Sequence, residues 1–231
     1  MVKALLAGCK SMTRRVLKPQ PREWKAQVID ISKPMRDDDG VWGQVRTEWS
    51  SPSFDMSMGE PEREIWEPIR LPAYVGDRLW VRETWADVNT DSGPALAYRA
   101  GGLRFCEEDA YPVEYERYPG CSFCMWWGDL ERGEPGHRWR SPIHMPRWAS
   151  RLTLTVTDVR VQRLQDISCA DAIAEGIRPA ANSATIDCDT PDPRNAYRDL
   201  WDSLHGPGAW ARNPWVAAIS FNTHHGATDG T

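Results

Sequence analysis

Residues 5–15 have the sequence Leu5-Leu6-Ala7-Gly8-Cys9-Lys10-Ser11-Met12-Thr13-Arg14-Arg15. The apolar run before Gly8 predicts a short helix that ends in a left-handed glycine cap. The residues after this cap are expected on a turn, and Lys10 and Thr13 share one face if the turn is nearly helical. The neighbouring cations repel one another unless an anionic group lies among them. The stretch therefore predicts an anion-binding site, with a solvated basic turn as the alternative.

The bulk composition restricts the classes of function. The 231-residue chain has a net charge of −5 and a pI of about 5.6. Non-specific binding to duplex DNA through phosphate neutralisation is therefore not expected. The charge fits a pocket for one nucleotide better than a long groove. The 13 tryptophans offer flat faces for stacking on bases, although most are expected to fill a core.

The chain shows no sign of a membrane or secretory destination. No apolar run approaches the roughly 20 residues that a membrane-spanning helix requires, and the segment Met1–Ala7 is too short for a signal peptide. We expect a cytoplasmic protein without a membrane partner. Its six cysteines are then reduced thiols or metal ligands.

A second informative stretch is Gly76-Asp77-Arg78-Leu79-Trp80-Val81-Arg82-Glu83-Thr84-Trp85. The alternation over Leu79–Trp85 predicts a strand that follows a Gly-Asp turn. Glu83 falls on the apolar face of this strand, where a buried carboxylate needs a partner. An arginine in a salt bridge at the rim is the simplest one.

Further strands are predicted at Leu152–Leu164, where β-branched residues are dense, and at Trp215–Phe221. Residues 41–46 also alternate, within a segment that otherwise resembles a loop. Helices are predicted at Ser168–Glu175 and at Pro193–Leu204.

Glu175 stands out within the first of these helices. Ser168 is a good N-cap and Gly176 ends the helix, so Glu175 lies on the last turn. A negative charge at this end opposes the helix dipole. A residue placed against the local rule is a candidate functional residue.

A polar, aromatic segment at about 87–140 contains a candidate zinc site. Cys121 and Cys124 have the Cys-x-x-Cys spacing at which two thiolates can hold one zinc ion. Cys106 and His137 can complete a tetrahedral set. The alternative is that these cysteines are free thiols on a loop.

Three stretches, in this order, resemble the ASCH domain family of the PUA-like superfamily. They are the Lys-x-x-Thr motif of Lys10 and Thr13, the Gly-Asp-x-Leu-Trp string at residues 76–80, and the Ala-x-x-Glu-Gly helix end at residues 172–176. The strings at residues 10–16 and 139–151 resemble the phage and prophage branch. The resemblance covers about half of the chain, with insertions at about 19–72 and 87–140 left over.

The resemblance implies an α+β, mainly β fold: a PUA-like β-barrel of about five to seven strands with flanking helices and long loop insertions. One domain is expected over residues 1–221, with a disordered tail at 222–231. In the resembled family a strand precedes the first helix, whereas this chain begins within the helix. The branch also implies a bacterial host.

The resemblance also implies a function, since some ASCH proteins are amidohydrolases that cleave N4-acetylcytidine. Their catalytic residues fall on Lys10, Thr13 and Glu175, with no cofactor required. Thr13 is then the nucleophile with Lys10 as its base, or it orients a water molecule. Further substrate contacts are expected from Arg14, Arg15, Glu83, Trp85, Arg147 and Trp148. The alternatives are a non-catalytic module that binds a modified nucleotide or single-stranded RNA, and a ribonuclease.

Overall fold

The computed structural model of the chain describes residues 1–18, 20, 26–37, 40–48, 64–106, 118–177 and 192–226. Contacts between Cα atoms divide the chain into two units. The first unit holds Lys3–Arg78 and Thr155–Asn222, and the second holds Leu79–Leu154 with the residues from Thr223 onward. Lys10, Thr13 and Glu175 therefore belong to the first unit.

A four-stranded sheet has the order β1 (Met12–Val16), β10 (Trp215–His225), β9 (Leu152–Arg163), β5 (Arg78–Trp80). β1 runs antiparallel to β10, with Thr13 opposite Ile219. The predicted strand that becomes β9 is confirmed. The closing strand is confirmed as β10, and it extends to His225, into the segment that was expected to be disordered.

The opening stretch folds in two parts. Helix α1 (Val2–Leu6) ends before Gly8, whose φ of 66° is the left-handed conformation that the glycine predicted. The chain after Gly8 is extended instead of helical, and it enters β1 at Met12. Pairing with β10 satisfies the backbone groups of this segment, so it gains nothing from a helical turn.

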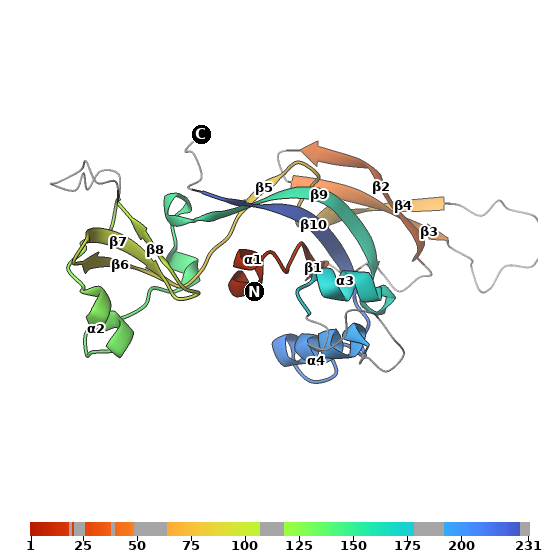
Figure 1. The fold of residues 1–231 in the computed structure, drawn as a ribbon. Coiled ribbons are helices and arrows are strands. Elements are labelled where there is room, and N and C mark those ends of the chain that lie inside the picture. The colour runs from red at the N-terminus through yellow and green to blue at the C-terminus, as the bar shows by residue number, and fades with distance from the viewer. Residues whose placement is uncertain are drawn as a thin grey trace, which may run out of the picture. The chain divides into compact units, whose positions relative to one another are not determined.

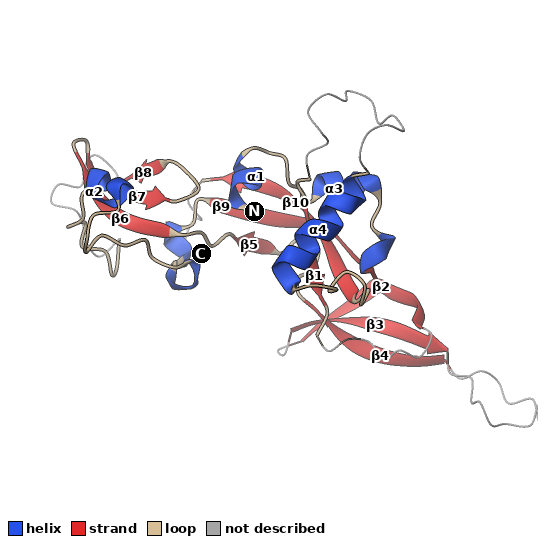
Figure 2. Cartoon of the chain, turned by 90° about the horizontal axis from the view of Figure 1, so that it is seen from below, coloured by secondary structure: helices blue, strands red, loops and turns tan. Residues whose placement is uncertain are grey.

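Two helices of the first unit lie together beside β1 (Figures 1 and 2). They are α3 (Cys169–Ala174) and α4 (Pro193–His205), and both confirm predicted helices. Ser168 caps α3 by accepting a hydrogen bond from the Asp171 amide at 3.0 Å. The apolar faces of both helices join one core cluster with the sheet, made of Leu164, Ile167, Ala172, Tyr197, Trp201, Ala209 and Val216.

The first insertion forms a sheet and not only a loop. Strands β2 (Ala26–Asp37), β3 (Gly40–Glu48) and β4 (Glu64–Leu71) pair as two antiparallel neighbours. β3 contains the strand predicted at residues 41–46. The expectation of a loop for the rest was wrong at β2 and β4, which lack a clear apolar alternation but are paired by backbone hydrogen bonds.

The second unit contains a three-stranded antiparallel sheet of β6 (Trp85–Thr90), β7 (Gly93–Tyr98) and β8 (Leu103–Phe105). Its helices are α2 (Trp127–Arg132) and the 3₁₀ turns η2 (Pro142–His144) and η3 (Arg147–Ala149); a further turn, η4 (Leu164–Asp166), follows β9 in the first unit. The prediction of a single strand at Leu79–Trp85 was wrong at residues 81–84, which lie outside both β5 and β6. The core of the second unit is the cluster Trp85, Leu96, Tyr98, Cys106, Cys121, Phe123, Met145 and Ala149.

The fold class is α+β with strands predominating, as predicted. Within the described residues, the strands form three separate antiparallel sheets and no closed barrel. The expected single barrel is therefore not observed there. In the same part of the chain, no helix has both the length and the apolar character needed to cross a membrane.

Candidate active site

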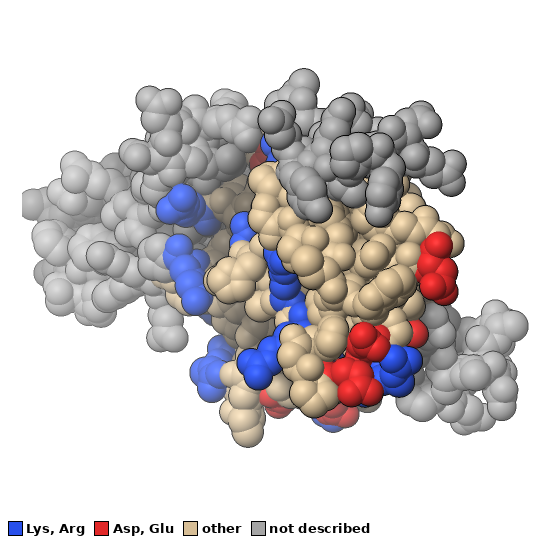
Figure 3. Space-filling view, turned by 90° about the vertical axis from the view of Figure 1, so that its left-hand side faces the viewer, with Lys and Arg blue, Asp and Glu red and all other residues tan. Residues whose placement is uncertain are grey.

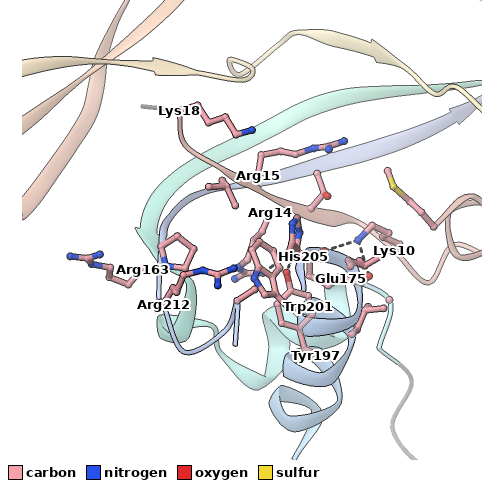
Figure 4. Close-up of a pocket in the computed structure, with 18 of the residues that line it drawn as sticks. Lys10, Arg14, Arg15, Lys18, Arg163, Glu175, Tyr197, Trp201, His205 and Arg212 are labelled. Atoms are coloured by element: carbon pink, nitrogen blue, oxygen red, sulfur yellow. Dashed lines mark hydrogen bonds and ion pairs between the residues drawn. The ribbon is translucent and has the colours of Figure 1, made fainter. Parts of the chain in front are cut away.

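A cleft of about 1310 Å³ opens in the first unit between β1, the end of α3 and one face of α4 (Figure 4). Lys10, Thr13 and Glu175 all line it, although Glu175 is 165 positions from Lys10 in the sequence. Arg14 and Arg15 line it too. Five of the nine residues proposed for catalysis and substrate binding therefore share one site.

The floor of the cleft holds a buried ion pair. The Lys10 ammonium donates to the Glu175 carboxylate at 2.6 Å and to the Glu175 backbone carbonyl at 2.8 Å. Both side chains are more than nine-tenths buried. The carboxylate and the carbonyl thus take up two of the donor positions of the Lys10 ammonium.

Backbone contacts bring the two partners together. The Ser11 amide donates to the Ala174 carbonyl at 2.9 Å, which joins the entry of β1 to the end of α3. Gly176 follows Glu175 with φ of 95°, and a Cβ there would lie 3.3 Å from the Ala4 Cβ and 3.5 Å from the Lys10 Cβ. The glycine that ends α3 thus also allows the close approach of Lys10.

Arg14 is the second cation on Glu175. Its guanidinium donates to Glu175 at 3.2 Å and to Asp171 at 2.7 Å, and the side chain is fully buried. Its Nε is buried without a hydrogen-bond partner among the described residues. Two cations and two carboxylates therefore form one buried network, in which the formal charges balance.

Asp171 is held by a third cation, Arg160, at 3.1 Å. Burial opposes ionisation of Asp171, but the hydrogen bond from Arg160 and the charge of Arg14 outweigh it, and the pKa of Asp171 is lowered. Asp171 is thus a carboxylate that fixes Arg14, and Arg14 in turn orients Glu175.

Helix α4 supplies an aromatic and apolar wall. The Tyr197 hydroxyl donates to Glu175 at 3.4 Å, and its pKa is raised by burial and by the Glu175 charge. Trp201 packs between Tyr197 and His205, with ring centroids 6.1 and 4.2 Å away. Leu200 and Leu204 also line the cleft, and both side chains are exposed.

The lining is strongly cationic. Its basic residues are Lys10, Arg14, Arg15, Lys18, Arg163 and Arg212, and Glu175 is the sole acidic residue among the described residues that line the cleft. Charge is also segregated elsewhere on the surface, where Figure 3 shows Lys and Arg side chains gathered apart from most Asp and Glu. A protein with a net charge of −5 thus carries a locally positive cleft.

The other four predicted substrate contacts belong to the second unit and do not line this cleft. Arg151 binds both carboxylate oxygens of Glu83 at 2.9 Å, which is the salt bridge given as the alternative role of that residue. Trp85 is 1% exposed and meets Trp148 edge to face at 6.0 Å. Arg147 lies in η3. Trp85 is therefore a core residue of the second unit.

The predicted zinc ligands have other surroundings in the structure. Cys106 and Cys121 are buried in the core cluster, Cys124 is exposed, and His137 lies 3.7 Å from Asp129. In the described part of the chain, no group of three or more His, Cys, Asp or Glu is arranged to hold a metal ion. Zinc binding by these residues stays a prediction.

The loop of the two cysteines is instead centred on a carboxylate. Asp87 accepts hydrogen bonds from the Ser122 and Phe123 amides at 2.7 and 3.1 Å, and it pairs with Arg140 at 2.5 Å. Burial raises the pKa of Cys121 to about 12. Without a metal ion, its thiol is therefore protonated near neutral pH.

Several residues of the cleft were missed by the sequence analysis. Tyr197 and Trp201 lie within one predicted helix, and Asp171, which belongs to the buried network beside the cleft, lies within the other. None of the three was assigned to a site. Arg163 and Arg212 carry no local signal, because Arg163 ends β9, Arg212 precedes β10, and both reach the cleft only through the fold.

Comparison with models of protein families, with curated proteins and with solved structures finds no match to this chain.

Proposed function

We propose that the protein is an ASCH-type amidohydrolase that removes the acyl group of an N4-acylated cytidine or a similarly modified pyrimidine. The proposal includes a PUA-like ancestry for the sheet that carries the cleft. The observation that carries it is the buried contact of Lys10 with Glu175 in a cleft that Thr13 also lines. The sequence resemblance points to the same three residues.

The ion pair favours one assignment of catalytic roles to Glu175, Lys10 and Thr13. Glu175, as a carboxylate, takes a proton from water while the water oxygen attacks the acyl carbon. The Lys10 ammonium stabilises the oxyanion that forms, and the Thr13 hydroxyl donates to the same oxygen. The C–N bond then breaks, its electron pair stays on N4, and Glu175 returns the proton to that nitrogen. The products are the free amine and a carboxylic acid, which releases its remaining proton to solvent and becomes a carboxylate.

In this scheme Thr13 is not required as a nucleophile. The base that this role would need, Lys10, is paired with Glu175. Arg14 shares the Glu175 carboxylate and keeps it oriented toward the cleft.

A second candidate function is binding of a nucleotide without turnover. It is favoured by the surplus of cations in the lining, which attracts phosphate whether or not a reaction follows. Turnover separates the two candidates.

The test is hydrolysis of N4-acetylcytidine and its 5′-monophosphate by the purified protein, with release of acetate as the readout. Glu175→Gln keeps the size of the side chain and removes the base, so we expect the rate to fall about 10²- to 10⁴-fold. Lys10→Met and Thr13→Val should also lower the rate, and combined losses should be smaller than additive.

Ser11→Ala is the matched control, because Ser11 lies between Lys10 and Thr13 and its side chain is exposed. It should leave the rate unchanged. Absence of turnover in the wild-type protein with every N4-acylated cytidine derivative, or full activity of Glu175→Gln, would rule the hydrolase out.

A further inference from the structure

The positive charge of the cleft is concentrated away from the buried network. Lys10 and Arg14 are neutralised by Glu175 and Asp171. Arg15, Lys18 and Arg212 are exposed, and within the described part of the chain none of them forms an ion pair. These three residues, here called the cationic wall, hold the surplus charge.

Arg163 lies at the same cleft, but its guanidinium is already engaged. It lies 4.5 Å from the centre of the Trp215 ring and donates to the Asn213 carbonyl at 3.2 Å. It adds positive charge, whereas the cationic wall has donors left for a ligand. Arg15, Lys18 and Arg212 line the cleft, and Figure 4 shows Arg15 and Lys18 beside β1 on the side away from Trp201, with Arg212 near Arg163.

Another wall of the cleft is apolar. Leu200 and Leu204, from successive turns of α4, are 41% and 68% exposed and line the cleft. The volume of about 1310 Å³ exceeds the roughly 300–1,000 Å³ of an ordinary small-molecule pocket. A nucleoside fills only part of it. The remaining space adjoins cations that have no carboxylate partner in the described part of the chain.

We propose that Arg15, Lys18 and Arg212 bind phosphate, so that the ligand of the cleft is a phosphorylated nucleotide in preference to a free nucleoside. The phosphate is the ligand's own 5′-phosphate or that of a neighbouring nucleotide in a single strand. Guanidinium and ammonium groups bind phosphate through charge-assisted hydrogen bonds. The inference rests on the proposed function for the identity of the base. Phosphate binding by the three cations does not require that the ligand is hydrolysed.

The experiment measures binding of cytidine, cytidine 5′-monophosphate and a short oligocytidylate to the full chain by calorimetry. We expect the monophosphate or the oligonucleotide to bind at least about tenfold more tightly than cytidine, the gain typical of one or two charge-assisted hydrogen bonds. A gain with the monophosphate identifies the 5′-phosphate. A gain with the oligonucleotide alone identifies the strand backbone.

Arg15→Gln, Lys18→Gln and Arg212→Gln should each weaken binding of the phosphorylated ligand about three- to tenfold and leave cytidine binding unchanged. The affinity should also fall with salt, and less steeply in these variants. Arg198→Gln is the matched control, since it removes one exposed positive charge from α4 outside the cleft lining.

Equal affinity for cytidine and both phosphorylated ligands, or absence of binding, would overturn the proposal. So would a loss in the Arg198→Gln control as large as in the three variants. Hydrolysis of N4-acetylcytidine without any phosphate preference would contradict this inference and leave the hydrolase standing. Phosphate-dependent binding without hydrolysis would support this inference and rule out the hydrolase.

Discussion

The cleft has a buried charged network at its floor, in a position where apolar residues could be equally or more stabilising. Its members are Lys10, Arg14, Asp171 and Glu175. Each ion loses its hydration, and replacing such networks by apolar residues is often neutral or stabilising. Their presence at the floor of a cleft is therefore a reason to look for function in them. The same burial makes each partner hard to remove alone.

The first prediction concerns the cost of an unpaired ion. Glu175→Ala leaves Lys10 buried without its carboxylate, and we expect the free energy of unfolding to fall by about 3–5 kcal/mol. The double variant Lys10→Met/Glu175→Leu should lose less than Glu175→Ala, because no ammonium is stranded. Urea denaturation at neutral pH provides the measurement. A double variant less stable than the single one would contradict this account.

The second prediction concerns the thiols of the second unit. Cys124 is exposed and should react with a thiol reagent in the native protein, whereas the buried Cys106 and Cys121 should react only on unfolding. Mass spectrometry of labelled peptides distinguishes them. If Cys121 and Cys124 bind zinc, Cys124 is protected as well, about one metal ion is present per chain, and Cys121→Ser abolishes it.

At the scale of elements, α3 sets the geometry of the site. A six-residue helix is not stable alone, and this one depends on the Ser168 cap, the packing of Ala172 and the turn at Gly176. Because Asp171 and Glu175 are four residues apart, both carboxylates face β1. Helix α3 thus positions both carboxylates of the buried network.

The third prediction tests this turn. Gly176→Ala places a side chain at a positive φ, which costs about 1–2 kcal/mol, and it also crowds Ala4 and Lys10. We expect lower stability and, for the proposed hydrolase, a lower rate because Lys10 is displaced. Gly208→Ala is the control, since its φ of 74° gives similar strain and, apart from its chain neighbours, no atom of the described residues lies within 4 Å of the added carbon. Thermal unfolding and turnover should be affected more by Gly176→Ala than by Gly208→Ala. Equal effects of the two variants on both measurements would show that crowding of Ala4 and Lys10 contributes nothing.

At the scale of the whole molecule, the buried network links stability to pH. The pKa of Asp171 in the folded protein is lower than its usual 3.8, so the unfolded chain binds the proton more tightly. Asp171 therefore contributes its full stabilisation above about pH 4. The contribution is lost as the pH falls through the folded-state pKa.

The fourth prediction follows from the lowered pKa of Asp171. The free energy of unfolding should fall between about pH 4 and the folded-state pKa, and Asp171→Asn should make that fall shallower while lowering stability at neutral pH. Urea unfolding followed by tryptophan fluorescence at a series of pH values provides the measurement. A variant with the same slope as the wild-type protein in this range would show that Asp171 does not contribute to it.

The sequence determined the elements whose signals are local. Gly8 and Gly176 marked the ends of α1 and α3, Ser168 marked the start of α3, and the periodicity of β9 and α4 gave their type and nearly their bounds. The resemblance pointed to Lys10, Thr13 and Glu175 as members of one site. Local chemistry sufficed there, because caps and periodicity depend on residues a few positions apart.

Only the tertiary structure decided how those elements are used. The sequence could not show that β1 replaces a helical turn, since β10 supplies its hydrogen bonds from 200 positions away. Nor could it separate Glu83, Trp85 and Trp148 from the cleft, because the division into two units depends on long-range contacts. Arg212 and Asp171 could not be recognised as site residues from the sequence, because their positions also depend on long-range contacts. A charge acquires its role from the charges packed around it, and those neighbours come together only when the chain folds.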